Sequence, residues 1–270
     1  MPAVRRLSFL LLLAAALAGC GSSSPPTPTG SSSPTTTGTS SASPNPDTAR
    51  STTTAKGSAR FTVLIDAVVG GSQVRSSETG TISFSKRLAH LYKLLPGGGM
   101  PQELIVDGPF VYSNANIEAA LKDRSVKPWT KLDTRRLSAK ERRSKPDELA
   151  HVVALVYLPD GMTAARRIDS MTVANERVTQ FRGQVDPARV VANAPASLRS
   201  GLAQALRNDY PAQPFPASFW LDDAGRVRRV LVSYTTSGGT QISLDGRFSE
   251  FGIAVDTAPP PSGSTADVSP

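Results

Sequence analysis

Two short motifs in the sequence carry residue types that could do chemistry. Ser83-x-x-Lys86 has the spacing of the serine and lysine of acyl-transferring enzymes, and Glu148-x-x-His151 has the spacing of a metal-binding pair on one helix face. The companion motifs Ser-Asp-Asn and Lys-Thr-Gly are absent, and His90 has no glutamate three residues before it. We interpret the first motif as an exposed strand terminus and the second as a surface hydrogen-bonded or salt-bridged pair. The sequence therefore predicts no enzyme activity, no metal site and no cofactor.

The composition excludes several other classes of protein. The chain of 270 residues has one cysteine and two histidines, which excludes disulfides and leaves few ligands for a metal. Walker A, GxGxxG, HExxH, GxSxG and CxxC motifs are absent. The net charge of +8 is moderate and the arginines are spread out, so nucleic acid is not an expected partner. The densest basic segment, 134–145, is interpreted as a solvated face, with partner docking as the alternative.

The N-terminus has the features of an export signal. Arg5 and Arg6 precede an apolar run from Leu7 to Leu17, which is shorter than the roughly 20 residues that span a bilayer. The run leads into Leu-Ala-Gly-Cys, which resembles a bacterial lipobox, so residues 1–19 are predicted to be a cleaved signal peptide and Cys20 the acylated N-terminus. An ordinary secretory signal with an unrelated cysteine is the alternative. Acylation would hold the protein at the extracytoplasmic side of the cell membrane.

Composition also divides the rest of the chain. Between Gly21 and Ser58, 31 of 38 residues are Ser, Thr, Pro or Gly, so no core is expected there. We predict that residues 20–58 form the lipidated cysteine and a flexible tether. Residues 59–258 are long enough for one domain with a substantial core, and residues 259–270 are predicted to be a disordered tail.

The predicted domain alternates strand signals with two helical segments. Ten or eleven strand-like segments are separated by short breaks, which favour antiparallel neighbours because parallel strands need long crossovers. The first helical segment follows Ser144, and the second begins near Asp186 and breaks at Pro195. The expected fold class is α+β. It consists of a single large curved antiparallel sheet, a half-barrel, with amphipathic helices covering its concave face.

The apolar faces of these segments supply the candidate binding residues. Both faces of the first strand are partly apolar, which is compatible either with packing on helices plus an edge patch or with an apolar pocket for acyl chains. The residues predicted to line such a pocket are Phe61, Val63 and Ile65 of the strand, Leu149, Val152, Val153 and Val156 of the first helix, and Leu198 and Leu202 of the second.

Four segments of the domain resemble a known family. They are Lys127–Asp133, Val178–Asp186, Phe219–Arg229 and Phe248–Gly252, and they follow one another behind the lipobox and the tether. In this order they resemble the actinobacterial LppX/LprA/LprF/LprG lipoprotein family and, more remotely, the LolA and LolB lipoprotein carriers. The resemblance covers nearly all of residues 59–258, whereas the basic segment 134–145 has no counterpart in it.

The resemblance implies a fold and a function. The family has a half-barrel sheet whose concave face, closed by helices, holds a hydrophobic cavity, so the implied function is binding or transfer of lipids or glycolipids in the envelope. Among family site residues, only Cys20 is carried over. The alternative function is an accessory module with a filled core that docks on a cell-wall component, an enzyme or an envelope transporter. The two functions differ in whether the concave face is open.

Overall fold

The computed structural model describes residues 43–144, 147–173, 176–236 and 238–270. The chain divides into two compact units, Met1–Thr39 and Ser40–Pro270, and all described residues belong to the second unit. The predicted signal peptide, Cys20 and the first part of the predicted tether lie outside the described residues. Among the described residues, no helix combines the length and the hydropathy that crossing a lipid bilayer requires.

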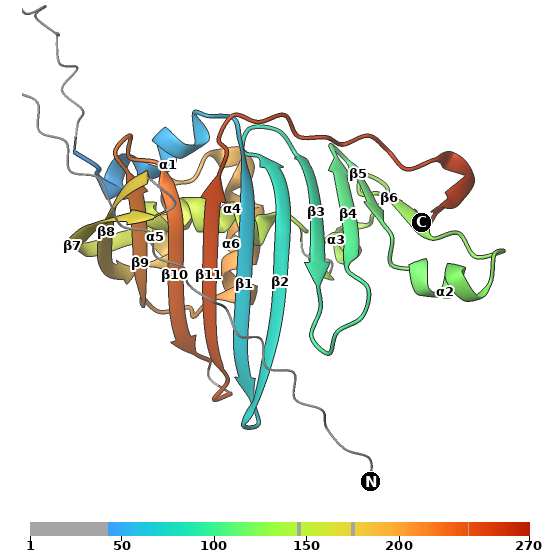
Figure 1. Cartoon of the computed structure of the whole chain (residues 1–270), viewed down its shortest axis with the longest axis horizontal. Helices are drawn as coiled ribbons and strands as arrows, with labels where there is room; N and C mark the ends of the chain where they lie inside the picture. The colour runs from blue at the N-terminus through green and yellow to red at the C-terminus, as the bar shows by residue number, and fades with distance from the viewer. Residues whose placement is uncertain (1–42, 145–146, 174–175, 237) are drawn as a thin grey trace, which may run out of the picture. The chain divides into compact units, whose positions relative to one another are not determined.

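The described residues form one twelve-stranded sheet. Its strands are β1 (Ser58–Val69), β2 (Ser72–Ser83), β3 (Leu88–Leu94), β4 (Gln102–Asp107), β5 (Phe110–Ser113), β6 (Trp129–Asp133), β7 (Met162–Val173), β8 (Glu176–Val185), β9 (Phe215–Asp222), β10 (Val227–Thr235), β11 (Gln241–Ser249) and β12 (Thr265–Asp267). Their spatial order is β12-β6-β5-β4-β3-β2-β1-β11-β10-β9-β8-β7 (Figure 1). All neighbours are antiparallel except β12 and β6, which run parallel. The predicted α+β class with one mostly antiparallel sheet is confirmed.

The twelfth strand is the difference from the predicted count of ten or eleven. β12 lies within residues 259–270, which the sequence analysis expects to be disordered, and it pairs with the edge strand β6. The backbone N–H of Val268 donates to the carbonyl of Lys131 at 2.9 Å, so the pairing continues beyond the strand. An edge strand offers unpaired backbone groups, and a short segment of polar sequence can satisfy them without any hydrophobic pattern.

Helices cover one face of the sheet. The described residues contain α1 (Pro46–Thr54), α2 (Ile117–Lys122), α3 (Ala139–Ser144), α4 (Ala150–Tyr157), α5 (Pro187–Asn193) and α6 (Ala196–Asp209). Figure 1 shows α4, α5 and α6 behind the strands from β9 to β1. Asp186 caps α5 by accepting a hydrogen bond from the N–H of Ala188 at 2.9 Å, and Pro195 separates α5 from α6. The predicted break in the second helical segment is therefore confirmed.

The core lies between the sheet and α4. Val152, Ala154, Leu155 and Val156 are completely buried, and α4 packs against α6 and α1 as well as against the sheet. Gly246 of β11 lies under Leu155, and a Cβ at that glycine would come within 2.6 Å of the Leu155 Cδ1 atom. The missing side chain thus lets helix and sheet approach closely. The sequence analysis expects an amphipathic helix here, whereas the structure buries α4 on both sides.

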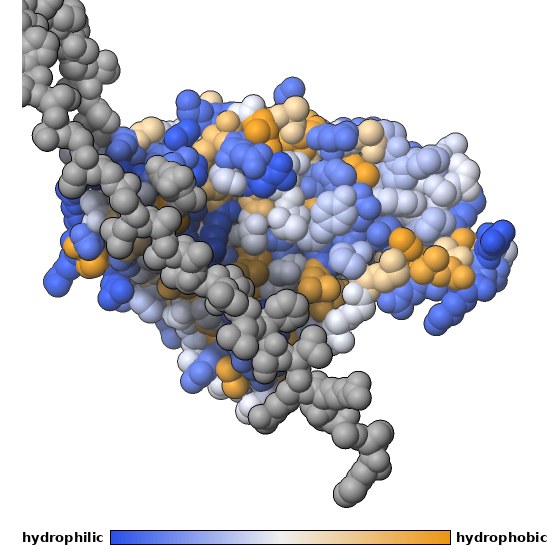
Figure 2. Space-filling model, in the orientation of Figure 1, coloured by the Kyte–Doolittle hydropathy of each residue, from blue (hydrophilic) through white to orange (hydrophobic). Residues whose placement is uncertain are grey.

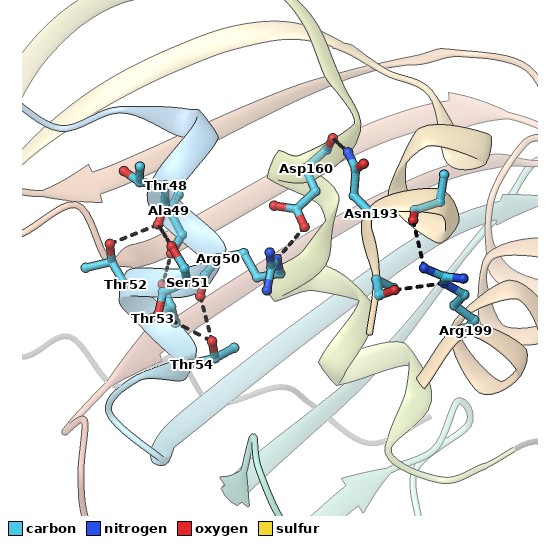
Figure 3. A network of polar contacts seen from close by, with 12 residues as sticks. Thr48, Ala49, Arg50, Ser51, Thr52, Thr53, Thr54, Asp160, Asn193 and Arg199 are labelled. Atoms are coloured by element: carbon cyan, nitrogen blue, oxygen red, sulfur yellow. Dashed lines mark hydrogen bonds and ion pairs between the residues drawn. The ribbon is translucent and has the colours of Figure 1, made fainter. Parts of the chain in front are cut away.

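The folded region also extends upstream of the expected boundary at residue 59. Helix α1, which the sequence analysis places in the tether, starts at Pro46 behind an Asn45 cap and buries Ala49 completely. The buried Thr53 hydroxyl donates to the carbonyl of Ala49 and accepts from the N–H of Val227 at 2.8 Å, which ties the helix to β10. Arg50 forms an ion pair with Asp160, as Figure 3 shows. These partners lie far away in sequence, so composition alone could not reveal the helix.

Candidate functional site

An open pocket of about 1010 Å³ lies on the concave face of the sheet. Its walls come from the N-terminal end of α4, the C-terminal end of α6 with residues 210–213, and strands β1, β2, β3, β10 and β11. The strand residues that line it are near the hairpin ends, since Ile65 and Ile242 lie close to the β1–β2 and β10–β11 turns. The pocket is therefore at the end of the concave face opposite to α1, which lies beside the start of β10.

The floor of the pocket is apolar. Ile65 of β1 pairs with Leu244 of β11, and Tyr234 of β10 pairs with Ile242 of β11. Residues that pair directly in an antiparallel ladder point to the same face, so these four side chains form one surface. Leu244 belongs to the buried core, and Ile65 and Tyr234 pack against it, so the floor of the pocket is an extension of that core.

One wall of the pocket is a network of four charged or titratable side chains, which we call the Glu78 network. The Glu78 carboxylate accepts a hydrogen bond from Nε2 of His151 at 2.7 Å and lies 3.4 Å from the ammonium of Lys93. Lys93 also donates to Glu148 at 2.7 Å. Glu78 on β2 and Lys93 on β3 are directly paired across the two strands. His151 lies in the first turn of α4, and Glu148 lies two residues before that helix begins.

The structure corrects two expectations from the sequence. Glu148 and His151 are predicted to form a pair with each other on the surface, but each binds a different residue of the sheet. The reason is that α4 lies against the concave face, so its first turn meets inward-pointing charges rather than solvent. Ser83 is likewise not an exposed terminus, because it is 9% exposed and its hydroxyl donates to the carbonyl of Gly57.

The environment changes the pKa values within the Glu78 network. Burial opposes ionisation of Glu78, but the hydrogen bond and charge of His151 together with the Lys93 ammonium outweigh it, so the pKa of Glu78 is lowered. Burial similarly opposes charging of Lys93, yet the carboxylates of Glu78 and Glu148 raise its pKa. Both groups are therefore charged near neutral pH, and each is only 13% exposed.

The C-terminal end of α6 and the residue after it add Asp209 and Tyr210 to the pocket lining, next to Tyr234 of the floor. Burial raises the pKa of Asp209, and the Tyr234 hydroxyl donates to the backbone carbonyl of Asp209. Burial, followed by the charge of Asp209, raises the pKa of Tyr234 to about 12. Tyr210 stacks on Phe215 with ring centroids 5.4 Å apart, and its buried hydroxyl has no hydrogen-bond partner among the described residues. A buried hydroxyl without a partner costs about 1–3 kcal/mol.

The nine residues predicted to line a cavity fall into two groups. Ile65 lines the pocket. The other eight belong to the packed region beside it, where Val153 and Leu198 are partly buried and six are buried in the core: Phe61, Val63, Leu149, Val152, Val156 and Leu202.

Sequence reasoning missed the charged wall and the tyrosines. A signal for the wall exists, because Glu78 precedes Gly80 and Ile82 at alternate positions of β2, and Lys93 follows Ala89 and Leu91 in the same way on β3. A charge in the position of an inward-facing apolar residue indicates a polar site in the core face.

The comparisons with known proteins concern structure alone. No protein-family model and no curated protein matches the chain. The chain is similar in structure to LprF from Mycobacterium bovis, with 13% identity and a TM-score of 0.48 over 81% of this chain and 99% of that one. For the lipoprotein LppX from Mycobacterium tuberculosis the identity is 12% and the TM-score 0.44, over 75% of this chain and 90% of that one.

A LolA superfamily protein from Nitrosomonas europaea matches more weakly. Its identity is 10% and its TM-score 0.29, over 75% of this chain and 91% of that one. The expected structural similarity to LppX-like and LolA-like proteins is therefore confirmed, at low sequence identity.

Proposed function

We propose that this protein binds an amphiphilic lipid or glycolipid in the concave pocket and acts as a membrane-anchored lipoprotein of the cell envelope. The observation that carries the proposal is the pocket itself, which joins an apolar floor to a charged wall. Its volume of about 1010 Å³ is at the upper end of the roughly 300–1,000 Å³ usual for ligand sites. An amphiphile presents the matching pair of surfaces.

The floor would bind the apolar part of the ligand. Each methylene that leaves water for Ile65, Ile242 and Leu244 contributes about 0.8 kcal/mol. Four or five methylenes would thus contribute about 3–4 kcal/mol. Selectivity for chain chemistry is not expected from such a surface, because dispersion and hydrophobic contacts are not directional.

The walls would bind the polar part. The Glu78 network offers carboxylate acceptors and an ammonium donor, and Asp209 offers a further carboxylate near them. Tyr210 also lines the pocket, and its buried hydroxyl has no hydrogen-bond partner among the described residues. A small movement of Tyr210 would let this hydroxyl form a hydrogen bond with a ligand. Polar groups of this kind fix the orientation of a ligand while the floor supplies most of the affinity.

Anchoring through Cys20 completes the proposal. With residues 1–19 removed and Cys20 acylated, the domain would remain at the extracytoplasmic surface of the cell membrane. The similarity to LprF and LppX, the latter described as a lipoprotein, supports this location. An open pocket can release its ligand without unfolding of the domain. The protein could therefore also transfer the ligand to a cell-wall component or an envelope transporter.

A second function is favoured by a different observation. Six of the residues predicted to line a cavity are buried in a packed core, so much of the concave face is filled. A filled core is expected for an accessory module that docks on a partner rather than carrying a lipid. One experiment distinguishes the two functions, because lipid binding and docking on a partner predict different results in it.

That experiment is native mass spectrometry of residues 21–270, the predicted mature chain without Cys20, after extraction and re-incubation with envelope lipids. The proposed function predicts lipid adducts that Ile65→Trp removes by occupying the floor and that Glu78→Gln weakens. The matched control is Glu103→Gln, which alters the other His–Glu pair, His90 with Glu103 at 2.7 Å, on the opposite face of the sheet. Adducts that survive Ile65→Trp, or an apo mass in every lipid, would favour the accessory module.

A further inference from the structure

Six large apolar side chains are exposed around one end of the sheet. We call them the apolar rim, and their exposures run from 39% to 73%: Val68, Val69, Leu94, Leu95, Met100 and Leu121. They come from the β1–β2 turn, the end of β3 with the loop to β4, and α2. Gly99 of the loop lies next to α2, since a Cβ there would be 3.6 Å from the Glu118 carboxylate. Figure 2 shows hydrophobic residues along this lower margin, from the tip of β1 and β2 toward α2.

The two loops of the apolar rim have an unusual composition. Segments 68–74 and 94–101 contain no charged residue in a chain that is 19% charged. Gly70 and Gly71 turn the first segment, and Gly97, Gly98 and Gly99 turn the second, all with positive φ values. The apolar side chains therefore project from narrow turns, and no carboxylate or ammonium within either segment must lose its hydration when the turns enter an apolar medium.

The apolar rim borders the mouth of the pocket. Ile65 on the pocket floor and Val69 lie on the same face of β1, four residues and therefore about 13 Å apart. On β3, Leu94 of the rim follows Lys93 of the pocket wall at the end of the strand and points to the other face of the sheet, so the rim surrounds the strand ends on both faces. A ligand that enters or leaves the pocket at the hairpin ends would pass beside these side chains.

The separate turns fit a lipid surface better than a protein partner. Single side chains on glycine turns can each enter a soft interface independently, whereas a protein interface needs one continuous complementary patch. The chain between Cys20 and residue 43 is also long enough for this arrangement. Its 23 residues can extend to about 75 Å, compared with about 40 Å for the twelve residues of β1 that separate α1 from the rim.

We infer that the apolar rim is a membrane-contact surface that holds the mouth of the pocket against the bilayer. The turns enter the interface between headgroups and acyl chains, and the apolar floor then continues the apolar medium of the bilayer into the pocket. The inference rests on the proposed function for its purpose, but membrane contact and lipid binding are measured separately.

The test is flotation of residues 21–270, which lack Cys20 and therefore an acyl group, with vesicles of phosphatidylcholine and phosphatidylglycerol. Changing Leu94, Leu95 and Met100 together to serine should lower the vesicle-bound fraction about tenfold or more, given the apolar area removed. The matched control changes Ile168, Met171 and Val173 to serine. These are 49%, 41% and 51% exposed on β7, the opposite edge strand of the sheet.

A second measurement guards against a folding defect in the rim variant. Leu95→Trp should show a blue shift of fluorescence on addition of vesicles, and Met171→Trp should not. Equal loss of flotation in both serine variants, or a wild-type chain that forms lipid adducts but does not float with vesicles, would overturn the inference. The absence of lipid adducts in mass spectrometry would instead overturn the proposed function, so the two failures are distinguishable.

Discussion

The packed end and the open end of the concave face are built from the same elements. On β1, Phe61 and Val63 are 1% and 0% exposed, whereas Ile65, two residues further on the same strand face, lines the pocket. Helix α4 changes in the same way, from the completely buried Leu155 near its C-terminal end to His151 at the pocket wall. Neither the strand nor the helix ends between the two regions.

The side chains at a few inward positions explain the difference. At the packed end, Gly246 removes a side chain and Leu155 fills the space. At the open end, Glu78 and Lys93 occupy the inward positions of β2 and β3, and covering their charges with apolar groups would cost several kcal/mol. The sheet and α4 thus meet through packed apolar side chains at one end and through hydrogen-bonded charged groups beside an open pocket at the other.

The largest expected effect is at the packed end. Leu155→Ala removes a completely buried side chain and should lower the free energy of unfolding by about 2–5 kcal/mol, measured by urea denaturation. Leu121→Ala, at a 73% exposed position, is the control and should change it by about 0.5 kcal/mol or less. A loss below 1 kcal/mol for Leu155→Ala, at odds with that range, would mean that the packed end is loose.

Gly246 gives a direct check of the close approach. Gly246→Ala should destabilise the wild-type chain by about 1–3 kcal/mol, because its Cβ meets the Leu155 side chain. The same change in a Leu155→Ala background should cost less, since the colliding atoms are gone. Additive effects in this double-mutant cycle would contradict the contact between β11 and α4.

Two tryptophan substitutions compare the ends within one strand. Val63→Trp should destabilise the protein by about 1–3 kcal/mol because position 63 is completely buried. Ile65→Trp should cost less than about 1 kcal/mol, since its ring can occupy the pocket. Thermal unfolding of the two variants measures the difference, and equal losses would show that the pocket cannot accept the ring.

The Glu78 network should contribute less than the packed core. Glu78→Gln weakens the interactions with His151 and Lys93, and we expect a loss of about 1–2 kcal/mol in the free energy of unfolding. Glu103→Gln alters a pair on the opposite face, where the side chains are 24% and 23% exposed, and should cost about 1 kcal/mol or less. An equal loss of free energy of unfolding in both variants would contradict a larger contribution of the Glu78 network to stability.

The smallest expected effect is a dependence on pH. The folded-state pKa of Glu78 is lowered from its usual 4.5, so its ionised form contributes stability above about pH 4.5 that is lost as the pH falls through the folded-state value. The difference between wild type and Glu78→Gln in urea denaturation should therefore shrink in acid. His151, Lys93, Glu148 and Asp209 share this environment. A difference that stays constant down to pH 2 would contradict the assignment of the charge.

Local signals were sufficient for much of the fold. Alternating strands with short breaks predicted the antiparallel sheet, and the Asp222 to Gly225 turn is present, with Gly225 at a φ of 81°. Pro195 ended one helix and preceded another as expected. These features depend on residues close together in the chain, whose conformational preferences are visible in sequence.

Long-range partners decided what sequence reasoning missed. Helix α1 consists largely of threonine, serine and arginine, and it is held by Val227 and Asp160 together with a small buried face that includes Ala49. β12 depends on the edge of β6 in a similar way. No pattern within either segment indicates the distant residues with which it forms hydrogen bonds.

The sequence by itself determined the fold class, most of the strands, the segments of α4, α5 and α6, and a set of candidate apolar residues within these elements. Only the tertiary structure decided which of those residues are core and which line a pocket. The physical reason is that burial is a property of the surroundings. Val63 and Ile65 are similar in chemistry and face the same way, but Val63 is completely buried, while Ile65 lines a pocket whose wall carries Glu78 and Lys93.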